Sequence, residues 1–397
     1  MATFSTPARP SPNARLVAFG ILVAACVLVV GARVVADRYH GDNIWRNTLA
    51  SIGGTQLNGD FGYVFLPASD KVLHGESPYV HPDTVRSRDS APYAYPPLLA
   101  LVVAPLKALP DRAHGMFLPG VVFSLVLVAA IGGALLLFEV RDWRCYVLAF
   151  LLPGSLESIE LGAIGPLLLL LVALAWRLRE RAGGAVAVGC CAALKLFLWP
   201  LFVWLFLTRR VRGAVLAVGV ATALVLVSWS VIGFRGLADY PRLLRRLDDV
   251  EAQSSYSVFA LLRTLDVPES AARALVAAAG LLVLVAAWRA ARTRGATAED
   301  ADRQSLILVI AAGLVVTPIL WIHYLVLLLA PIALARRRLS ALWFTPLAFT
   351  LFEALGWYRG WAYGDTKALV SVVAVGAAVV IASLAALGNR TRLAACL

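Results

Sequence analysis

The sequence predicts an all-α polytopic membrane protein, on the evidence of its composition and the spacing of its apolar segments. Of the 397 residues, 60% are hydrophobic and only 15% are charged, whereas a soluble domain is about 45–50% apolar and about 25% charged. The apolar residues gather in runs close to the ~20 residues that a spanning helix needs. We therefore expect one integral membrane domain over residues 1–397, with about 10–13 membrane segments of which some are short or re-entrant.

The apolar segments follow one another along the chain, with basic clusters between several of them. The first, at 16–36, lacks a convincing small-x-small cleavage site and is expected to stay as an uncleaved helix. The segment 145–158 fits a simple span least well, and we expect it to be re-entrant or to lie in the membrane interface. The other expected segments are 96–109, 115–138, 159–176, 213–233, 270–290, 340–358 and 368–387.

A long polar stretch at 37–93 separates the first two segments and is expected to be an outer loop. Apolar residues recur with helical spacing in its middle, which predicts an amphipathic helix lying in the membrane interface. These apolar residues are Phe61, Val64, Phe65, Ala68 and Val72.

The stretch 183–207 lies between basic clusters at 177–181 and 209–212. A single span would put one cluster outside, against the tendency of arginine and lysine to stay on the cytoplasmic side. Two short helices with a break near Pro200 avoid this, because proline cannot donate a backbone hydrogen bond within a helix. Lys195 would then lie at an outward-facing turn.

The stretch 305–335 lies between the basic clusters at 289–294 and 336–338, and we interpret it in the same way. A turn near Pro318 would place His323 on the outer side. With both hairpins, the two termini lie inside, and 37–93, 234–256 and 359–366 lie outside.

Three ionisable residues are candidates for chemistry, and each has a structural alternative. Asp60 could cap the interfacial helix, or it could act as a general base at the lipid–water boundary. Lys195 could extend from a helix end toward water, or it could serve a site at membrane depth. His323, close to Trp321 and Tyr324, could belong to an interfacial aromatic belt or to the same site.

A site that combines these three residues suits transfer of a sugar from a polyprenyl phosphate. Asp60 would take the proton from the acceptor hydroxyl, and Lys195 and His323 would stabilise the departing phosphate. The phosphate is a good leaving group, so the second carboxylic acid that glycosidases use is not required. One direct displacement would invert the anomeric centre, and we expect no metal or other cofactor. A lipid or sugar transporter (a flippase) and a non-catalytic scaffold are the alternatives.

Several short motifs, taken together, resemble glycosyltransferase family 87, the polyprenol-phosphate-sugar-dependent enzymes of the GT-C superfamily. The resemblance runs from about residue 58 to about residue 340. Besides Asp60, Lys195 and His323, its landmarks include the substrate-binding candidates Tyr63, Tyr95, Gln253, Ser254 and Trp321.

The resemblance implies a GT-C-like fold, an outward-facing active site and α-mannosyl transfer from polyprenyl-phosphate-mannose, with Asp60 at the position of the base. Arabinofuranosyl transfer from a decaprenyl phosphate donor also occurs in the family and is the alternative. Family members often carry Gly-Gln where this chain has Gly162-Ala163, and Asn-Gln-Ser where it has Ala252-Gln253-Ser254. These differences concern recognition of the sugar or the acceptor.

The expected partners are a polyprenyl-phosphate sugar donor, a glycolipid or polysaccharide acceptor, and membrane lipid. The net charge of +12 lies largely in loops between apolar segments, which favours a membrane protein and gives no reason to expect nucleic acid. Arginine greatly outnumbers lysine, as is typical of GC-rich bacterial genomes. We therefore expect a multi-pass protein of a bacterial plasma membrane.

Overall fold

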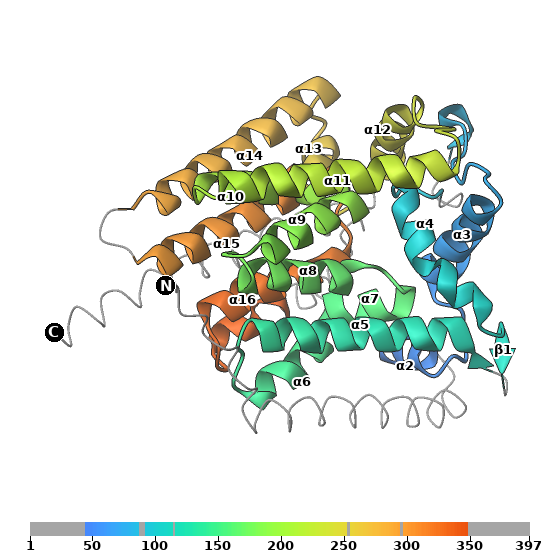
Figure 1. Ribbon diagram of the computed structural model, residues 1–397, viewed down its shortest axis with the longest axis horizontal. Coiled ribbons are helices and arrows are strands. Elements are labelled where there is room, and N and C mark those ends of the chain that lie inside the picture. The colour runs from blue at the N-terminus through green and yellow to red at the C-terminus, as the bar shows by residue number, and fades with distance from the viewer. Residues whose placement is uncertain (1–43, 87–91, 114–115, 252–254, 294–296, 348–397) are drawn as a thin grey trace, which may run out of the picture.

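A computed structural model describes residues 44–86, 92–113, 116–251, 255–293 and 297–347. The regular structure of these residues is helical (Figure 1), apart from two short antiparallel strands, β1 (Arg112–Ala113) and β2 (Met116–Phe117). The expected all-α membrane fold is confirmed. The expected segments 16–36 and 368–387, and most of 340–358, lie outside the described residues.

Three described helices are long and apolar enough to cross a membrane: α5 (Leu118–Leu137), α11 (Val211–Val231) and α14 (Glu269–Ala291). They match the expected segments 115–138, 213–233 and 270–290. In Figure 1 the axes of α5 and α11 lie nearly side-on to one another across the molecule, and α14 is inclined to both. Two helices connect α5 to α11 across the core. They are α8 (Gly165–Arg177), which contacts α5, and α9 (Ala182–Leu194), which contacts both α8 and α11.

The hairpin expected around Lys195 is confirmed by its two arms and by the ion pairs at its open end. Helix α9 ends at Leu194, Lys195 has an extended backbone (φ −151°, ψ 111°), and a 3₁₀ turn, η5 (Leu196–Leu198), follows. Helix α10 (Pro200–Leu207) starts at the proline, where the missing N–H costs nothing. Arg210 and Glu180, which flank the hairpin, form an ion pair.

The second expected hairpin is formed by α15 (Ala298–Val316), the 3₁₀ helix η6 (Ile322–Leu328) and α16 (Leu329–Ala335). Its two ends meet where Arg337 pairs with Glu299 at 3.6 Å. We call the region where both hairpins open the basic end. It comprises residues 139–141, 177–181, 209–212, 299–303 and 336–338.

The segment 145–158 forms α6 (Trp143–Leu151) and the start of α7 (Pro153–Leu161). Helices α7 and α8 are bent by 119° at a short break, as in a broken span or a re-entrant loop. Helix α7 is largely buried and contacts α2 (Ile44–Ile52) and η6. This geometry fits the re-entrant alternative for this segment better than an interfacial one.

The helix expected in the outer loop forms as a π-helix, η1 (Phe61–Phe65), followed by α3 (Leu66–Leu73). The apolar residues Phe61, Phe65, Ala68 and Val72 are buried against protein, and the expected position of this helix in the membrane interface stays a prediction. Phe61 and Phe65 are fully buried, and Phe61 stacks on Phe123 of α5 with ring centroids 4.3 Å apart. The pattern located the apolar side of the helix, and that side packs on the protein core.

The remaining elements are short, and several lie at the end of the molecule opposite the basic end. Helix α4 with its 3₁₀ extension is shorter than the expected segment 96–109. These elements are η2 (Pro82–Thr84), α4 (Pro97–Val103), η4 (Ala104–Ala108), α12 (Tyr240–Glu251), α13 (Val258–Thr264) and η7 (Ala341–Leu347).

Candidate active site

Asp60 lies at the start of the π-helix η1, and its side chain does not cap that helix. Its backbone angles are helical (φ −64°, ψ −44°), and its carboxylate makes no capping hydrogen bond. The capping alternative for Asp60 is therefore wrong. Because π-helices are rare and occur frequently at functional sites, the local backbone marks this position as unusual.

The turn that carries Asp60 is held against the bend between α7 and α8. Asn58 is fully buried and donates hydrogen bonds to Ser124 Oγ and to the Ile159 carbonyl, both at 3.1 Å. Gly162 has a left-handed backbone (φ +67°), and a Cβ there would lie 2.5 Å from the Cβ of Phe61. This close approach needs glycine and fixes the backbone next to Asp60.

Lys195 turns into the protein instead of extending toward water. Its Nζ donates a hydrogen bond to Tyr95 Oη at 3.0 Å. The same Nζ lies 3.8 Å from the ring centroid of Tyr324 and 4.5 Å from that of Tyr95. Aromatic faces attract a cation without neutralising it. Lys195 is therefore held in place while its charge stays available.

Tyr95 is positioned by a hydrogen-bonded aromatic segment at the start of α4. The Tyr95 carbonyl accepts a hydrogen bond from Tyr79 Oη at 2.8 Å, and the Ala94 carbonyl accepts one from Tyr240 Oη at 2.9 Å. The Tyr95 ring also meets Phe65 edge-on, with centroids 5.1 Å apart. The partner of Lys195 is thus tied to α12 and to the helix that follows Asp60.

His323 is buried beside Tyr324, and neither of its ring nitrogens has a hydrogen-bond partner among the described residues. Its carbonyl accepts a hydrogen bond from Ser158 Oγ at 3.1 Å. A Cβ at Gly165 would lie 2.8 Å from that carbonyl, so η6 can approach α8 this closely only because glycine stands there. The burial of His323 is at odds with an exposed aromatic-belt residue.

Asp60 and Lys195 influence each other electrostatically. Burial raises the pKa of the Asp60 carboxyl from 3.8 to about 6, and the positive charge of Lys195 opposes part of this rise. Asp60 forms no hydrogen bond or ion pair with any described residue. A carboxylate with a raised pKa and a free lone pair is suited to accept a proton near neutral pH.

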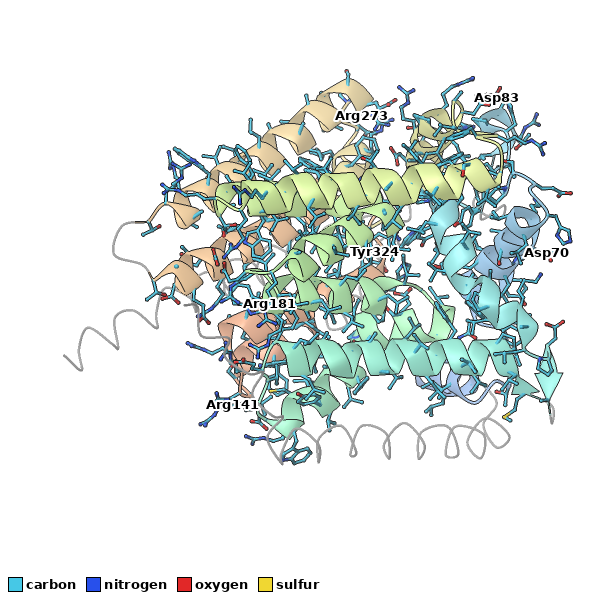
Figure 2. All side chains as sticks on the ribbon, in the orientation of Figure 1. Asp70, Asp83, Arg141, Arg181, Arg273 and Tyr324 are labelled. Carbon is cyan, nitrogen blue, oxygen red and sulfur yellow. The ribbon has the colours of Figure 1, made fainter. Side chains whose placement is uncertain are left out.

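The structure brings Asp60, Tyr95, Lys195, His323 and Tyr324 together, and we call these five residues the Lys195 cluster. In Figure 2, Tyr324 lies centrally, with Arg141 and Arg181 toward one end of the molecule and Asp70 toward the other. The cluster thus occupies the interior between the basic end and the opposite end.

The other candidates predicted from the sequence fall in different places. Tyr63 is 67% exposed, and no contact with the Lys195 cluster is found among the described residues. Trp321 is partly buried and directly precedes η6. Gln253 and Ser254 lie outside the described residues. The roles of these four residues in substrate binding stay predictions.

Sequence reasoning missed two residues that shape the cluster. It named Tyr324 only as a neighbour of His323, yet this ring forms the closer aromatic face under Lys195. Phe197, from the first hairpin, stacks on Tyr324 from the second, with centroids 5.4 Å apart and planes 4° from parallel. An aromatic residue at the turn of each hairpin was the available signal. Pairing them required knowledge that the turns meet.

A cavity of about 180 Å³ lies between Tyr79 and the start of α12. His81, Asp239 and Tyr240 contribute polar groups to its lining, together with an aromatic surface from Tyr79. Tyr79 links this cavity to the cluster through its hydrogen bond to the Tyr95 carbonyl. Among the described residues, no three His, Cys, Asp or Glu side chains are grouped so as to hold a metal ion.

The sequence model for glycosyltransferase family 87 matches residues 93–318. The chain belongs to glycosyltransferase family 87. The match includes Tyr95 and Lys195, whereas Asp60 and His323 lie outside it on either side. It is also shorter than the stretch over which the sequence motifs resemble the family. Searches of curated proteins and of solved structures found no match.

Family membership shows that this membrane protein is a glycosyltransferase, which requires a sugar donor and an acceptor. The transporter and scaffold alternatives are therefore set aside. The Lys195 cluster supplies the chemical groups that such a transfer needs: an unpaired carboxylate, a cation on aromatic faces and a histidine with free ring nitrogens.

Proposed function

We propose that this glycosyltransferase moves a sugar, with mannose as the expected one, from a polyprenyl-phosphate donor to a glycolipid or polysaccharide acceptor on the outer face of the membrane. The observation that carries the proposal is that Asp60 and Lys195 lie close enough to influence each other electrostatically, while no ion pair with a described residue neutralises either charge. The alternative sugar is arabinofuranose, delivered from decaprenyl phosphate.

In the proposed reaction, the acceptor oxygen attacks the anomeric carbon while Asp60 takes the proton from the hydroxyl. The bond between that carbon and the phosphate oxygen breaks, and its electron pair leaves with the polyprenyl phosphate. The ammonium group of Lys195 stabilises the negative charge that develops on the phosphate. The attack and the departure occur on opposite faces of the sugar, so the anomeric configuration inverts.

His323 is proposed as a second contact to the phosphate. A buried polar group without a partner costs folding free energy, about 1–3 kcal/mol for a typical group. Both ring nitrogens of His323 lack a partner among the described residues. A phosphate oxygen bound beside Lys195 would accept a hydrogen bond from the imidazole and remove part of this cost.

The cavity beside Tyr79 is proposed to receive the acceptor. Aromatic rings pack against the apolar face of a sugar, and carboxylate, imidazole and hydroxyl groups bind its hydroxyls. Asp239, His81 and Tyr240 supply these groups. The link from Tyr79 to Tyr95 connects this acceptor site to the Lys195 cluster.

The outward orientation is supported by the arrangement of charges. The ion pairs of both hairpins gather at the basic end, which the positive-inside tendency assigns to the cytoplasm. Helix α9 separates Lys195 from the basic end, and its 13 residues span about 20 Å at 1.5 Å per residue. A donor whose sugar faces outward would reach the cluster from the opposite end.

The direct test is transfer by the purified protein in nanodiscs. Labelled polyprenyl-phosphate-mannose and decaprenyl-phosphate-arabinofuranose are offered in parallel with lipid-linked and soluble glycan acceptors. We expect transfer from the mannose donor, with inversion at the anomeric carbon measured by NMR of the product. Transfer from the arabinofuranose donor alone would show that the enzyme transfers arabinofuranose and not mannose. A product with retained configuration, or no transfer from either donor, would contradict the proposal.

A further inference from the structure

A cavity of about 460 Å³ opens at the basic end, away from the Lys195 cluster. Its charged lining comes from three separate parts of the chain: the loop between α5 and α6, helix α15, and the segment after α16. These residues are Arg141, Glu299, Arg303, Arg336, Arg337 and Arg338.

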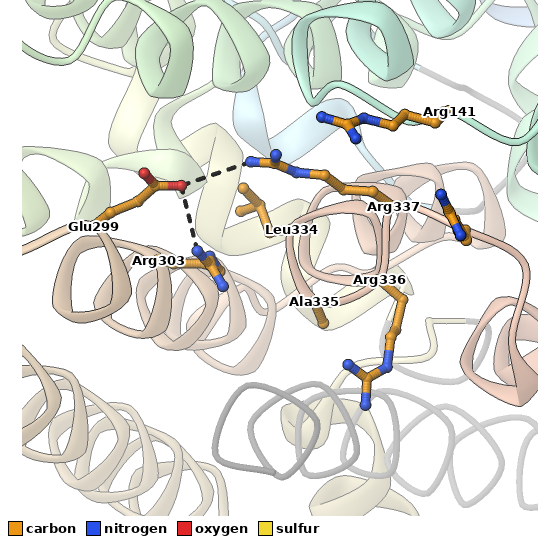
Figure 3. A pocket seen from close by; sticks show the side chains of 8 residues that line it. Arg141, Glu299, Arg303, Leu334, Ala335, Arg336 and Arg337 are labelled. Carbon is orange, nitrogen blue, oxygen red and sulfur yellow. Dashed lines mark hydrogen bonds and ion pairs between the residues drawn. The ribbon is translucent and has the colours of Figure 1, made fainter. Parts of the chain in front are cut away.

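The cavity carries a large excess of positive charge. Glu299 is its one carboxylate, and this group is shared between Arg303 at 3.3 Å and Arg337 at 3.6 Å (Figure 3), with Arg179 from outside the lining at 4.0 Å. Arg141 and Arg338 have no carboxylate partner among the described residues. Figure 3 shows the side chains of Arg141 and Arg337 extending in the same direction, toward Glu299.

Carboxylates outside the cavity do not remove this excess. Arg337 also pairs with Glu139 at 2.8 Å, and Arg303 pairs with Asp300 at 3.3 Å. Both arginines are therefore oriented by fixed partners, while Arg141 and Arg338 remain available for a ligand.

The backbone that carries these arginines is fixed by long-range hydrogen bonds. The N–H of Arg141 donates to the Arg337 carbonyl at 2.9 Å. The indole N–H of Trp343, a fully buried residue, donates to the Arg336 carbonyl at 3.0 Å. The N–H of Leu339 donates to Asp142 Oδ2 at 3.2 Å. The arginines thus project from a preorganised frame, which lowers the entropic cost of binding a ligand.

The lining indicates the chemical class of the ligand. Guanidinium groups bind phosphate oxygens through paired, charge-assisted hydrogen bonds, and several of them together suit a phosphate group. Leu334 and Ala335 supply an apolar part of the lining at the end of α16. Arginine clusters next to the ends of membrane helices attract the anionic headgroups of lipids.

We propose that this cavity binds a phosphate-bearing anion at the basic end, separately from the transferred sugar and its donor. The headgroup of an anionic phospholipid and a soluble polyphosphate share this chemistry. The experiment below distinguishes them. The proposal does not depend on which sugar the enzyme transfers.

The test measures thermal stabilisation of the full chain in detergent by three probes: short-chain phosphatidylglycerol, short-chain phosphatidylcholine and inorganic pyrophosphate. The double variant R141Q/R338Q removes the two cavity arginines for which no described residue is a carboxylate partner. The double variant R181Q/R212Q is the matched control, because it removes the same charge from exposed arginines of the basic end that do not line the cavity.

We expect phosphatidylglycerol to stabilise the wild type at lower concentration than phosphatidylcholine. Its half-saturating concentration should rise at least about tenfold in R141Q/R338Q and change by less than about twofold in the control. Stabilisation by phosphatidylglycerol but not by pyrophosphate supports a lipid headgroup, and stabilisation by both supports binding of the phosphate group alone. Equal weakening in the two double variants, or no stabilisation by either anion, would overturn the proposal.

Discussion

The basic end and the Lys195 cluster both contain partly buried charged side chains, but their partners differ. Carboxylates pair with the arginines of the basic end, whereas Lys195 has uncharged partners. Arg210 bonds both carboxylate oxygens of Asp302, at 2.6 and 3.1 Å, and also pairs with Glu180. Within the described part of the chain, Lys195 is bound only by a tyrosine hydroxyl and two ring faces. Asp60 has no polar partner among the described residues.

This difference separates the ion-paired charges of the basic end, which hold the fold together, from the charges of the Lys195 cluster, which are kept for a ligand. The ion pairs of the basic end connect the two ends of each hairpin, so these paired charges are already satisfied in the folded protein. The Lys195 cluster is positioned by aromatic packing, and its charges remain unsatisfied until a phosphate and an acceptor hydroxyl arrive. Substitutions in the two regions should therefore have opposite effects on stability and turnover.

The largest effect on turnover is expected for Asp60→Asn, which removes the proposed base and keeps the size of the side chain. Turnover should fall by about 10²–10⁴-fold, the usual contribution of a general base. Because burial disfavours the ionised carboxylate, the variant should not melt below the wild type at pH 7.5. Initial rates and thermal melting measure the two quantities.

Asp70→Asn is the matched control, since Asp70 lies on the adjoining helix α3, is exposed and pairs with Lys107. It should retain turnover within about threefold, because an exposed ion pair contributes only about 0–1 kcal/mol. Equal losses in the two variants would show that Asp60 has no special role as a base.

Lys195→Met should lower turnover by about 10²–10³-fold, the effect of removing one group that stabilises charge in the transition state. Methionine keeps the length and apolar stem of lysine and can still pack on Tyr324. Lys71→Met, at an exposed lysine of α3, is the control and should be silent. Normal turnover of Lys195→Met in single-turnover assays would rule out the lysine as the phosphate contact.

His323→Phe should separate stability from function most clearly. Phenylalanine fills the space of the imidazole and removes two buried nitrogens that have no partner, so the variant should melt at or above the wild-type temperature. Its turnover should still fall about tenfold or more, because a donor to the phosphate is lost. A lower melting temperature with unchanged turnover per folded molecule would assign His323 to structure alone.

Arg210→Gln should show the opposite pattern at the basic end. Losing its hydrogen bonds to Asp302 should reduce the free energy of unfolding by roughly 1.5–3 kcal/mol, the usual contribution of a hydrogen bond to a charged group. Turnover per folded molecule should stay near that of the wild type. A large loss of turnover without a loss of stability would show that Arg210 acts in the transfer reaction and does not mainly stabilise the fold.

The sequence was sufficient to predict both hairpins. Basic clusters at each end of 183–207 and 305–335 conflict with single spans, and Pro200 and Pro318 mark the positions where the chain turns. Both arguments use only the order of residues along the chain, so they require no knowledge of the fold. The long helices α5, α11 and α14 were predictable from the length of their apolar runs.

The surroundings of Asp60 could not be predicted. Helical spacing of Phe61 and Phe65 showed which side of the helix is apolar, but spacing does not tell whether lipid or protein covers that side. The π-helix depends on packing against the bend at Gly162. Likewise, Tyr324 became the main aromatic face under Lys195 because the two hairpin turns meet, and this contact joins residues far apart in the sequence.

If Asp60 is the general base, its ionisation should appear in the pH dependence of turnover. Because Asp60 must be deprotonated to act and its pKa is raised to about 6, turnover should fall as the pH drops below about 6. The measurement is kcat of the wild type and of Asp60→Asn from pH 5 to pH 8. We expect the wild type to lose turnover at acidic pH with a midpoint near 6, and we expect this pH dependence to be absent from the residual activity of Asp60→Asn. The same acidic loss of activity in Asp60→Asn would show that another group is the base.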